Sequence, residues 1–246
     1  MKAYILPYGK LKLPKFAMYG DGAGDEILEF PSYGVLVEHK DGLVLFDTGC
    51  SMDPSHPNII PDMCEYTEKD TIPARLASVG YTAEDIDYVI FSHMHVDHAG
   101  DMQLFSNATF VAGKDEKIGM TTIPDDHMPD ELLEIFKTPT FKWKLLELGE
   151  TELLPAIKLH NFGPGHSYNM LAMELDFETP ILAVGDLVYH QWAYDGKPAG
   201  FAADPEGYKS SIFFVRKLAE SLGAEVWFGH DPDQFPLLRK APEYYC

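Results

Sequence analysis

Residues 92–100 read Ser92-His93-Met94-His95-Val96-Asp97-His98-Ala99-Gly100 and place three imidazoles and one carboxylate within six positions. Residues 87–91, just before them, form an apolar and β-prone run, so a strand is predicted to deliver these side chains into the loop at its end. In an extended segment alternate side chains point the same way, which would put His93, His95 and Asp97 on one side. His98 would then reach a second position beside them. This density of ligand-type side chains predicts two adjacent metal ions.

Three further polar residues follow apolar runs or a glycine-rich turn elsewhere in the chain. His166 comes after Gly163-Pro164-Gly165, Asp186 ends the run 180–185, and His230 follows the run 225–229. Neutral imidazole and carboxylate are the ligands expected for zinc and similar divalent ions. We therefore group these residues with the 93–98 cluster as candidate metal ligands.

The pattern of elements predicts a mixed fold. Two β-rich runs, 35–39 and 43–47, flank a short Asp-Gly turn and predict a hairpin. Amphipathic spacing predicts helices over 69–79 and 208–222, whereas 14–31 is read as a loop. The stretch 113–144 carries few signals apart from a predicted loop around Asp125, Asp126 and Pro129 and a candidate helix at 131–137. Further strands are predicted at 2–6, 87–91, 108–112, 156–160, 170–177, 180–185 and 225–229. Hairpins together with strand–helix alternation predict an α/β (α+β) class with mixed sheets and outer helices, in a single domain over residues 1–246.

Charge and hydropathy limit the possible partners. The formal net charge is −20, and such a surface disfavours nucleic acid and anionic lipid, which normally require a surplus of Lys and Arg. No stretch approaches the roughly 18 apolar residues of a membrane-spanning helix. A small neutral or weakly charged partner is expected, with the oligomeric state open between monomer and homodimer.

The cysteines are few and widely spaced: Cys50, Cys64 and Cys246. An odd number without a CxxC pair makes a disulfide framework unexpected and favours a reducing cytoplasm. None of the three lies near the histidine cluster in the sequence, so none is taken as a ligand. The interrupted N-terminal run predicts no secretory signal.

Four short segments together resemble a known family. They are Ser92-His-Met-His-Val-Asp-His-Ala-Gly100, Gly163-Pro-Gly-His166, Asp186-Leu-Val-Tyr189 and Phe228-Gly-His-Asp231, and Asp204-Pro205 before the 208–222 helix also fits. Over roughly residues 30–245 the chain resembles the metallo-β-lactamase superfamily, and within it the N-acyl-homoserine lactonases and related small-lactone hydrolases. The resemblance implies an αββα sandwich, the metallo-β-lactamase fold, with the metals at one edge between the two sheets.

The resemblance also implies a division of labour among the ligands. His93, His95 and His166 would hold the first metal, Asp97, His98 and His230 the second, and Asp186 would bridge them beside a water or hydroxide. Two Zn²⁺ per chain are expected, although manganese, iron or cobalt could occupy the same ligands. Asp47, in Asp47-Thr48-Gly49, matches a position that supports the ligands from behind.

The implied reaction is hydrolytic opening of a lactone ring, with the bridging hydroxide attacking the carbonyl carbon. Asp97 or Asp186 would carry a proton to the leaving alkoxide, and the phenol of Tyr189 would donate a hydrogen bond to the carbonyl oxygen or the leaving group. N-acyl-homoserine lactones as substrates would make the enzyme quorum-quenching. The aromatic residues in 16–19 and 189–201 are expected to select the substrate.

Two other functions remain open from the sequence. The first is another hydrolase of the same fold that acts on a thioester, a phosphodiester, another cyclic ester or amide, or a β-lactam; the acidic surface disfavours a nuclease. The second is a non-enzymatic binding or sensing domain, which is disfavoured because every ligand position is filled. The remaining histidines, His39, His56, His127, His160 and His190, are expected to be structural or exposed.

Overall fold

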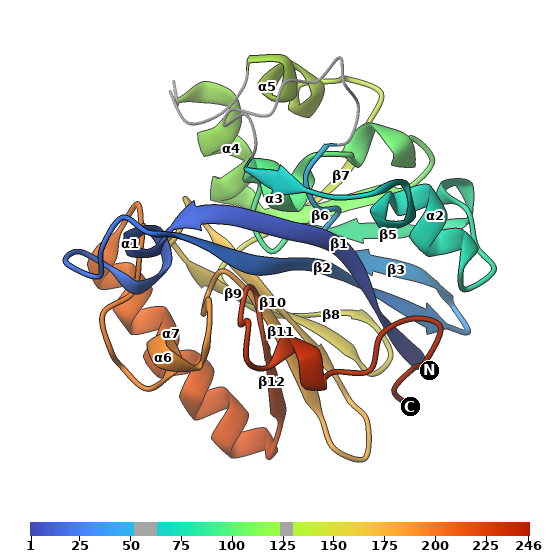
Figure 1. The fold of residues 1–246 in the computed structure, drawn as a ribbon. Helices are drawn as coiled ribbons and strands as arrows, with labels where there is room; N and C mark the ends of the chain where they lie inside the picture. The colour runs from blue at the N-terminus through green and yellow to red at the C-terminus, as the bar shows by residue number, and fades with distance from the viewer. Residues whose placement is uncertain (52–62, 124–129) are drawn as a thin grey trace.

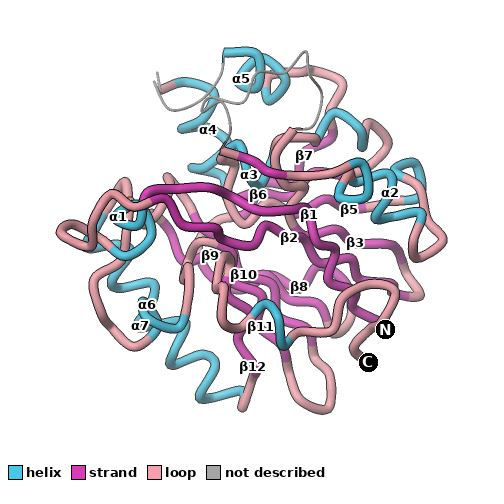
Figure 2. Tube along the Cα trace, in the orientation of Figure 1, coloured by secondary structure: helices cyan, strands magenta, loops and turns pink. Residues whose placement is uncertain are grey.

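Two β-sheets stack against each other, with helices on both outer sides (Figures 1 and 2). The computed structural model describes residues 1–51, 63–123 and 130–246. Within these residues one sheet has seven strands in the order β4 (Cys64–Glu65), β1 (Lys2–Pro14), β2 (Ile27–His39), β3 (Gly42–Phe46), β5 (Tyr88–Ile90), β6 (Thr109–Gly113) and β7 (Lys142–Leu146). The other has five, in the order β12 (Glu225–Phe228), β11 (Ile181–Gly185), β10 (Met170–Leu175), β9 (Ile157–Gly163) and β8 (Gly149–Leu154).

The helices divide between the two outer sides of this sandwich (Figure 1). α2 (Ile72–Ala77), α3 (Val96–Ala99), α4 (Lys114–Thr122) and α5 (Asp130–Phe136) lie on the side of the seven-stranded sheet, and α6 (Gln191–Tyr194) and α7 (Pro205–Leu222) lie on the other. α1 (Lys15–Tyr19) sits in the connection from β1 to β2, and 3₁₀ turns cover Glu68–Asp70, Ala83–Asp85, Met102–Phe105 and Phe235–Leu237. The predicted αββα sandwich is confirmed.

The central strands are apolar on both faces, because both faces are covered. Val35 and Val37 of β2 belong to the core between the sheets, together with Trp227 of β12. Leu36, between them, points the other way and packs in the cluster beneath the helices with Leu76 of α2. Strands buried on two sides therefore read as continuous apolar runs rather than as an alternation.

The longest helix, α7, has clear signals at both ends. The Asp204 side chain accepts a hydrogen bond from the Gly207 amide at 3.0 Å, and Pro205 occupies the first turn, where its missing N–H has no cost. Gly223 ends the helix in the left-handed conformation with φ 63°. The buried face, with Ile212 and Val215, is the one that the apolar spacing predicted.

The predicted hairpin is present, since β2 pairs antiparallel with β3 from Val35–Phe46 to His39–Gly42. The prediction of a loop over 14–31 is wrong in part. β1 runs to Pro14, α1 follows it, and β2 starts at Ile27, so that only the turn over residues 20–26 lacks regular structure. Pro31 has no N–H to donate, and it is tolerated in β2 beside the irregular pairing with β1, where the register shifts between Pro7 and Lys10.

The stretch 113–144 and the residues after it hold elements that the sequence did not predict. α4, β7 and β8 all lie there, and only the candidate helix at 131–137 has a counterpart, α5. β7 and β8 are the terminal strands of their sheets, and their mixed polar pattern, as in Lys142-Trp-Lys, hides them from an apolar-run criterion. The predicted loop around Asp125, Asp126 and Pro129 lies outside the described residues.

The expectation about cysteines is wrong. Cys50 and Cys64 form a disulfide, and Cys246 is free and exposed. Cys50 is also near the histidine cluster in space: the Gly100 amide, at the end of the 92–100 motif, donates to the carbonyl of Gly49, which directly precedes Cys50. The spacing of the cysteines in the sequence did not indicate the disulfide, because it depends on the pairing of β4 with β1, which positions Cys64. The cytoplasmic location stays a prediction, without support from the cysteines. No helix in the described part of the chain has the length and apolarity to cross a membrane.

Candidate metal centre

The loops that follow β5, β9, β11 and β12 bring the seven predicted ligands to one edge of the sandwich. His93, His95 and His166 form one cluster, which we call the imidazole group. Asp97, His98, Asp186 and His230 form a second, the mixed group. One geometric prediction is wrong: Asp97 does not continue the alternation of His93 and His95. α3 begins at Val96, and the helical turn directs Asp97 and His98 to the same group.

In the imidazole group three ring nitrogens converge on one point. Nε2 of His93 lies 2.9 Å from Nδ1 of His95, which lies 2.8 Å from Nε2 of His166. The other nitrogens of His93 and His166 face acceptors, the Ser92 hydroxyl at 3.1 Å and the Phe201 carbonyl at 3.0 Å. Those outer nitrogens therefore carry the hydrogens, and both Nε2 atoms present lone pairs. Nδ1 of His95 can donate to only one of them, so the arrangement suits a cation.

The mixed group has the spacing of ligands around a small divalent ion. Nε2 of His98 lies 3.4 Å from Oδ1 of Asp186 and 3.5 Å from Oδ2 of Asp97. Nε2 of His230 lies 3.0 Å from Oδ1 of Asp186 and 3.6 Å from Oδ2 of Asp97. Tetrahedral zinc with bonds of about 2.0–2.2 Å separates its ligand atoms by about 3.3–3.6 Å.

Asp186 connects the two groups. Its Oδ1 faces His98 and His230, while its Oδ2 lies 3.4 Å from Nε2 of His166 in the imidazole group. One carboxylate thus offers an oxygen to each group. The glycine that follows β12 makes this approach possible, since a Cβ on Gly229 would lie 2.7 Å from Oδ1 of Asp186.

Buried atoms without partners mark the same place. Among the described residues, the buried side-chain atoms that lack a hydrogen bond include Nε2 of His98, Oδ1 of Asp186 and Nε2 of His230. Unpaired buried polar atoms are costly, by about 1–3 kcal/mol each, and they call for a missing partner. Two divalent ions would satisfy them and would more than offset the negative charge of the two carboxylates. The residues present therefore fit a metal pair.

Asp47 holds the mixed group from behind. Its Oδ2 accepts from Nδ1 of His98 at 2.8 Å and from the Ser92 hydroxyl at 2.8 Å, and its Oδ1 accepts from the Ser92 amide at 2.7 Å. The bond to Nδ1 fixes the tautomer of His98 and leaves Nε2 free to bind a metal. Asp47 adopts φ 62°, a conformation that Asp and Asn tolerate better than most residues.

Two backbone carbonyls orient the remaining imidazoles. Nδ1 of His230 donates to the Pro31 carbonyl at 2.8 Å, as Nδ1 of His166 donates to Phe201. The Tyr189 hydroxyl also donates to the Phe201 carbonyl at 2.6 Å, and it lies 2.5 Å from Nδ1 of His166. Sequence reasoning missed these carbonyls and the part played by Ser92. The sequence does not indicate which backbone carbonyls will accept hydrogen bonds from ligands. Ser92, however, lies inside the 92–100 motif, and its hydroxyl could have been predicted to contact a ligand.

The two groups differ in the direction of their pKa shifts. Burial lowers the pKa of His95 to about 3 and that of His93 well below its usual range, and the neighbouring imidazoles add to the effect. Burial also acts against the charged form of His98, but Asp97, Asp186 and Asp47 outweigh it and raise its pKa. The imidazole group is therefore neutral at pH 7, the form that binds metals.

The other histidines that the structure describes have structural partners. His190 caps α6 by accepting from the Ala193 amide and contacts the Met18 carbonyl. His160 pairs with Glu174 at 2.6 Å on the five-stranded sheet. His39 accepts from the Asp41 amide in the β2–β3 turn. His56 and His127 lie outside the described residues.

Aromatic residues lie beside the candidate ligands. The ring of Phe201 is about half exposed and lies 5.7 Å from the ring of His166 and 6.4 Å from that of His95. Its loop is joined to α1, because the Phe201 amide donates to the Ala17 carbonyl. Tyr19 stacks on His190 at 4.4 Å. The segments predicted to select the substrate, 16–19 and 189–201, are thus in contact with each other beside the metal centre.

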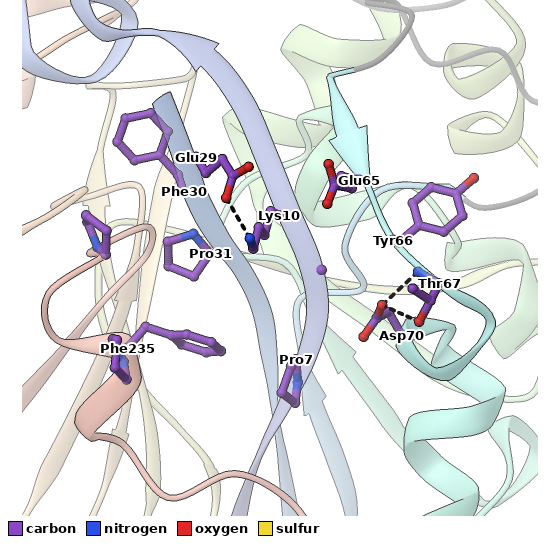
Figure 3. Close-up of a pocket in the computed structure, with 13 residues that line it drawn as sticks. Pro7, Lys10, Glu29, Phe30, Pro31, Glu65, Tyr66, Thr67, Asp70 and Phe235 are labelled. Carbon is purple, nitrogen blue, oxygen red and sulfur yellow. Dashed lines mark hydrogen bonds and ion pairs between the residues drawn. The ribbon is translucent and has the colours of Figure 1, made fainter. Parts of the chain in front are cut away.

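A separate pocket of about 440 Å³ lies beside β1 and β2 and contains none of the seven candidate ligands (Figure 3). Its lining includes the apolar residues Phe30, Pro31 and Phe235 and the pair that Lys10 forms with Glu29. The Pro31 carbonyl that orients His230 belongs to the strand that borders the pocket.

The family model for the metallo-β-lactamase superfamily matches residues 28–230. The chain belongs to the metallo-β-lactamase superfamily. Among characterised members of this superfamily, the chain is 32% identical to the N-acyl homoserine lactonase AiiB of Agrobacterium fabrum over 98% of both chains. It is 29% identical to the N-acyl homoserine lactonase AiiA of Bacillus thuringiensis subsp. kurstaki, over 99% of this chain and 98% of that one.

Solved structures of superfamily members agree with this likeness. A mutant of B. thuringiensis AiiA with N-decanoyl-L-homoserine bound at the active site matches with a TM-score of 0.88 and 26% identity, over 99% of this chain and 98% of that one. An N-acyl homoserine lactone hydrolase with N-hexanoyl-L-homoserine bound at the catalytic metal centre matches with the same values. The dizinc quorum-quenching lactonase AidC, at 20% identity and a TM-score of 0.72 over 98% of this chain and 92% of that one, shares the fold.

Proposed function

We propose that this protein is a dinuclear metallohydrolase that opens the ring of N-acyl-homoserine lactones or related small lactones, and so acts in quorum quenching. One observation carries the proposal: two ligand clusters share the Asp186 carboxylate at one edge of a sandwich like those of lactonases with acyl-homoserine products bound. The imidazole group and the mixed group would each hold one metal. Zinc suits this set of nitrogen and oxygen ligands, and manganese, iron or cobalt are alternatives.

When bound, the metal pair would supply Lewis acidity and would lower the pKa of bound water to about 7. In the reaction, oxygen from water bonds to the carbonyl carbon, the ring C–O bond breaks, and the leaving alkoxide takes up a proton. Asp97 is better placed than Asp186 to carry that proton. The Asp97 side chain is 14% exposed, whereas Asp186 is 4% exposed and offers both oxygens to the ligand groups.

Tyr189 remains our candidate for a hydrogen-bond donor to the carbonyl oxygen or the leaving group. In the structure its hydroxyl is buried and donates to the Phe201 carbonyl beside His166. A substrate oxygen near His166 would compete with that carbonyl for the same hydrogen. Tyr189 thus has two possible acceptors, and substrate binding would shift the hydroxyl from one to the other.

A panel of substrates tests the proposed reaction. The lactones should vary in acyl length, and acid release should be followed at constant pH beside a short thioester and a β-lactam. We expect turnover of lactones and about two metal equivalents per purified chain. Turnover of the thioester or the β-lactam with no turnover of any lactone would favour the alternative hydrolase. One equivalent or fewer under metal-replete conditions would contradict the metal pair.

We infer that residues 1–246 act as one domain, because the core between the sheets draws on both, from Ala3 to Trp227. The net charge of −20 supports a small-molecule substrate rather than nucleic acid or a membrane. We also propose a monomer or homodimer in the cytoplasm.

A further inference from the structure

Glu116 is a buried carboxylate in the first turn of α4, outside the ligand clusters. It is fully buried, which is costly for an ionised side chain unless several donors surround it. Its Oε1 accepts from the Met94 amide at 2.7 Å, and its Oε2 accepts from the Asn169 amide at 2.8 Å. The Ser167 hydroxyl lies 2.9 Å from both oxygens. Burial raises the pKa of Glu116 to about 7, and the hydrogen bonds act against that rise.

These donors come from two loops that carry the imidazole group. Met94 lies between His93 and His95, and Ser167 directly follows His166. A single carboxylate therefore joins the loop after β5 to the loop after β9. All of its partners are N–H or O–H donors, so the ionised form is the one that they accommodate.

Close packing of α4 brings Glu116 to this junction. A Cβ on Gly113 would lie 1.8 Å from Oδ1 of Asn169, and a Cβ on Gly119 would lie 2.4 Å from the ring of Tyr168. These glycines stand three residues before and after Glu116, so that they lie near the same face of the helix. The helix face is shaped to lie directly against the loop that follows His166.

We propose that Glu116 is a positioning residue that sets the distance between the two loops of the imidazole group and so determines the metal affinity of that group. The proposal rests on the metal pair of the proposed function but not on the identity of the substrate. Glu116 has no hydrogen bond to a candidate ligand and acts through two backbone amides and the Ser167 hydroxyl beside the ligands. The mixed group has no hydrogen bond to Glu116, so its affinity is expected to be independent of this residue.

Metal titration of the stripped protein tests the inference, with Glu116→Gln as the variant. Glutamine keeps the shape but turns an N–H₂ toward a surrounding set of donors. With Zn²⁺ in competition with a chromogenic chelator, we expect one of two equivalents to weaken about 10–100-fold, the range for lost outer partners of a metal ligand. The other equivalent should keep the wild-type affinity. Histidine ¹⁵N resonances should assign the weakened equivalent to His93, His95 and His166.

The matched control is Glu174→Gln, which changes another buried glutamate, hydrogen-bonded to His160 rather than to the ligand loops. It should bind two equivalents as the wild type does. Two wild-type affinities in Glu116→Gln, or equal weakening of both equivalents, would overturn the inference. If Glu116→Gln does not fold, Ser167→Ala decides, because it removes one donor and should weaken the same equivalent several-fold; no change there would overturn it. A wild-type chain with fewer than two equivalents would contradict the metal pair itself.

Discussion

The imidazole group and the mixed group lie side by side and share Asp186, but they are built from different chemistry. The imidazole group itself consists of three neutral rings, and burial lowers the pKa of each of them. The mixed group has Asp97 and Asp186 beside its two imidazoles, and these carboxylates raise the pKa of His98 and His230 against the effect of burial. The ligands of the imidazole group are neutral and depend on precise placement, whereas those of the mixed group also attract one another by charge.

The residues behind the two groups differ in the same way. A carboxylate, Asp47, holds His98 of the mixed group. The Ser92 hydroxyl and the Phe201 carbonyl face the outer nitrogens of His93 and His166 in the imidazole group. Substitutions should therefore affect the two groups separately: loss of charge should weaken metal binding in the mixed group, and loop displacement should weaken it in the imidazole group.

The largest effect is expected for Asp186→Asn, because this residue serves both groups. Asparagine loses the charge and one of the two acceptor oxygens. Turnover should fall more than about 100-fold, since even an outer partner of a ligand is typically worth ~10–100-fold. Lactone hydrolysis and metal content should be measured together. Asp176→Asn, at an exposed position, is the control, and two tightly bound equivalents in Asp186→Asn would contradict the bridging role.

Asp47→Asn should separate the two groups. Asparagine tolerates the left-handed backbone of Asp47, so the change tests the charge and the acceptor rather than the fold. We expect the mixed group to lose ~10–100-fold in metal affinity while the imidazole group keeps its own. Zinc titration gives both values. Equal weakening of both groups would remove the proposed distinction between charge and geometry.

Tyr189→Phe should have a moderate effect on turnover and little effect on metal content. A single donor to a developing oxyanion is worth about 3 kcal/mol or less when other groups remain. We expect a lower kcat with two equivalents still bound. A wild-type kcat would show that Tyr189 takes no part in the reaction. Loss of one metal equivalent would instead show that Tyr189 helps to orient His166 through the Phe201 carbonyl.

Phe201→Ala should have the smallest effect, confined to binding of the acyl chain. The carbonyl that orients His166 belongs to the backbone and remains, so kcat should stay close to that of the wild type. Full burial of a phenylalanine side chain is worth about 1.5–3 kcal/mol, which sets an upper limit here, and KM should rise for long acyl chains more than for short ones. Phe213→Ala, on the exposed face of α7, is the control. An equal rise in KM at every chain length would place the acyl chain elsewhere.

Sequence and structure agree best where the local pattern is strong. The hairpin of β2 and β3 and the long helix α7 were predicted because turn residues, caps and apolar spacing act over a few residues. The edge strands β7 and β8 were not: β7 pairs with β6, which lies on the far side of α4 and α5 in the chain, and the polar residues of β8 hide its hairpin with β9. The disulfide between Cys50 and Cys64 was not predicted either, because it depends on the pairing of β4 with β1, which no local pattern around the cysteines indicates.

By itself the sequence determined the ligand chemistry, because imidazoles and carboxylates packed into 93–98 have few other uses, and it determined the fold through its resemblance to a known superfamily. The resemblance also implied which residue belongs to which group, and only the tertiary structure showed the physical reason. The turn at Val96 moved Asp97 away from His93 and His95, and the two oxygens of Asp186 face different groups. The backbone carbonyls behind the ligands and the Glu116 carboxylate between two loops also emerged only there. These contacts join segments dozens of residues apart, and no local pattern in the chain encodes the distances between them.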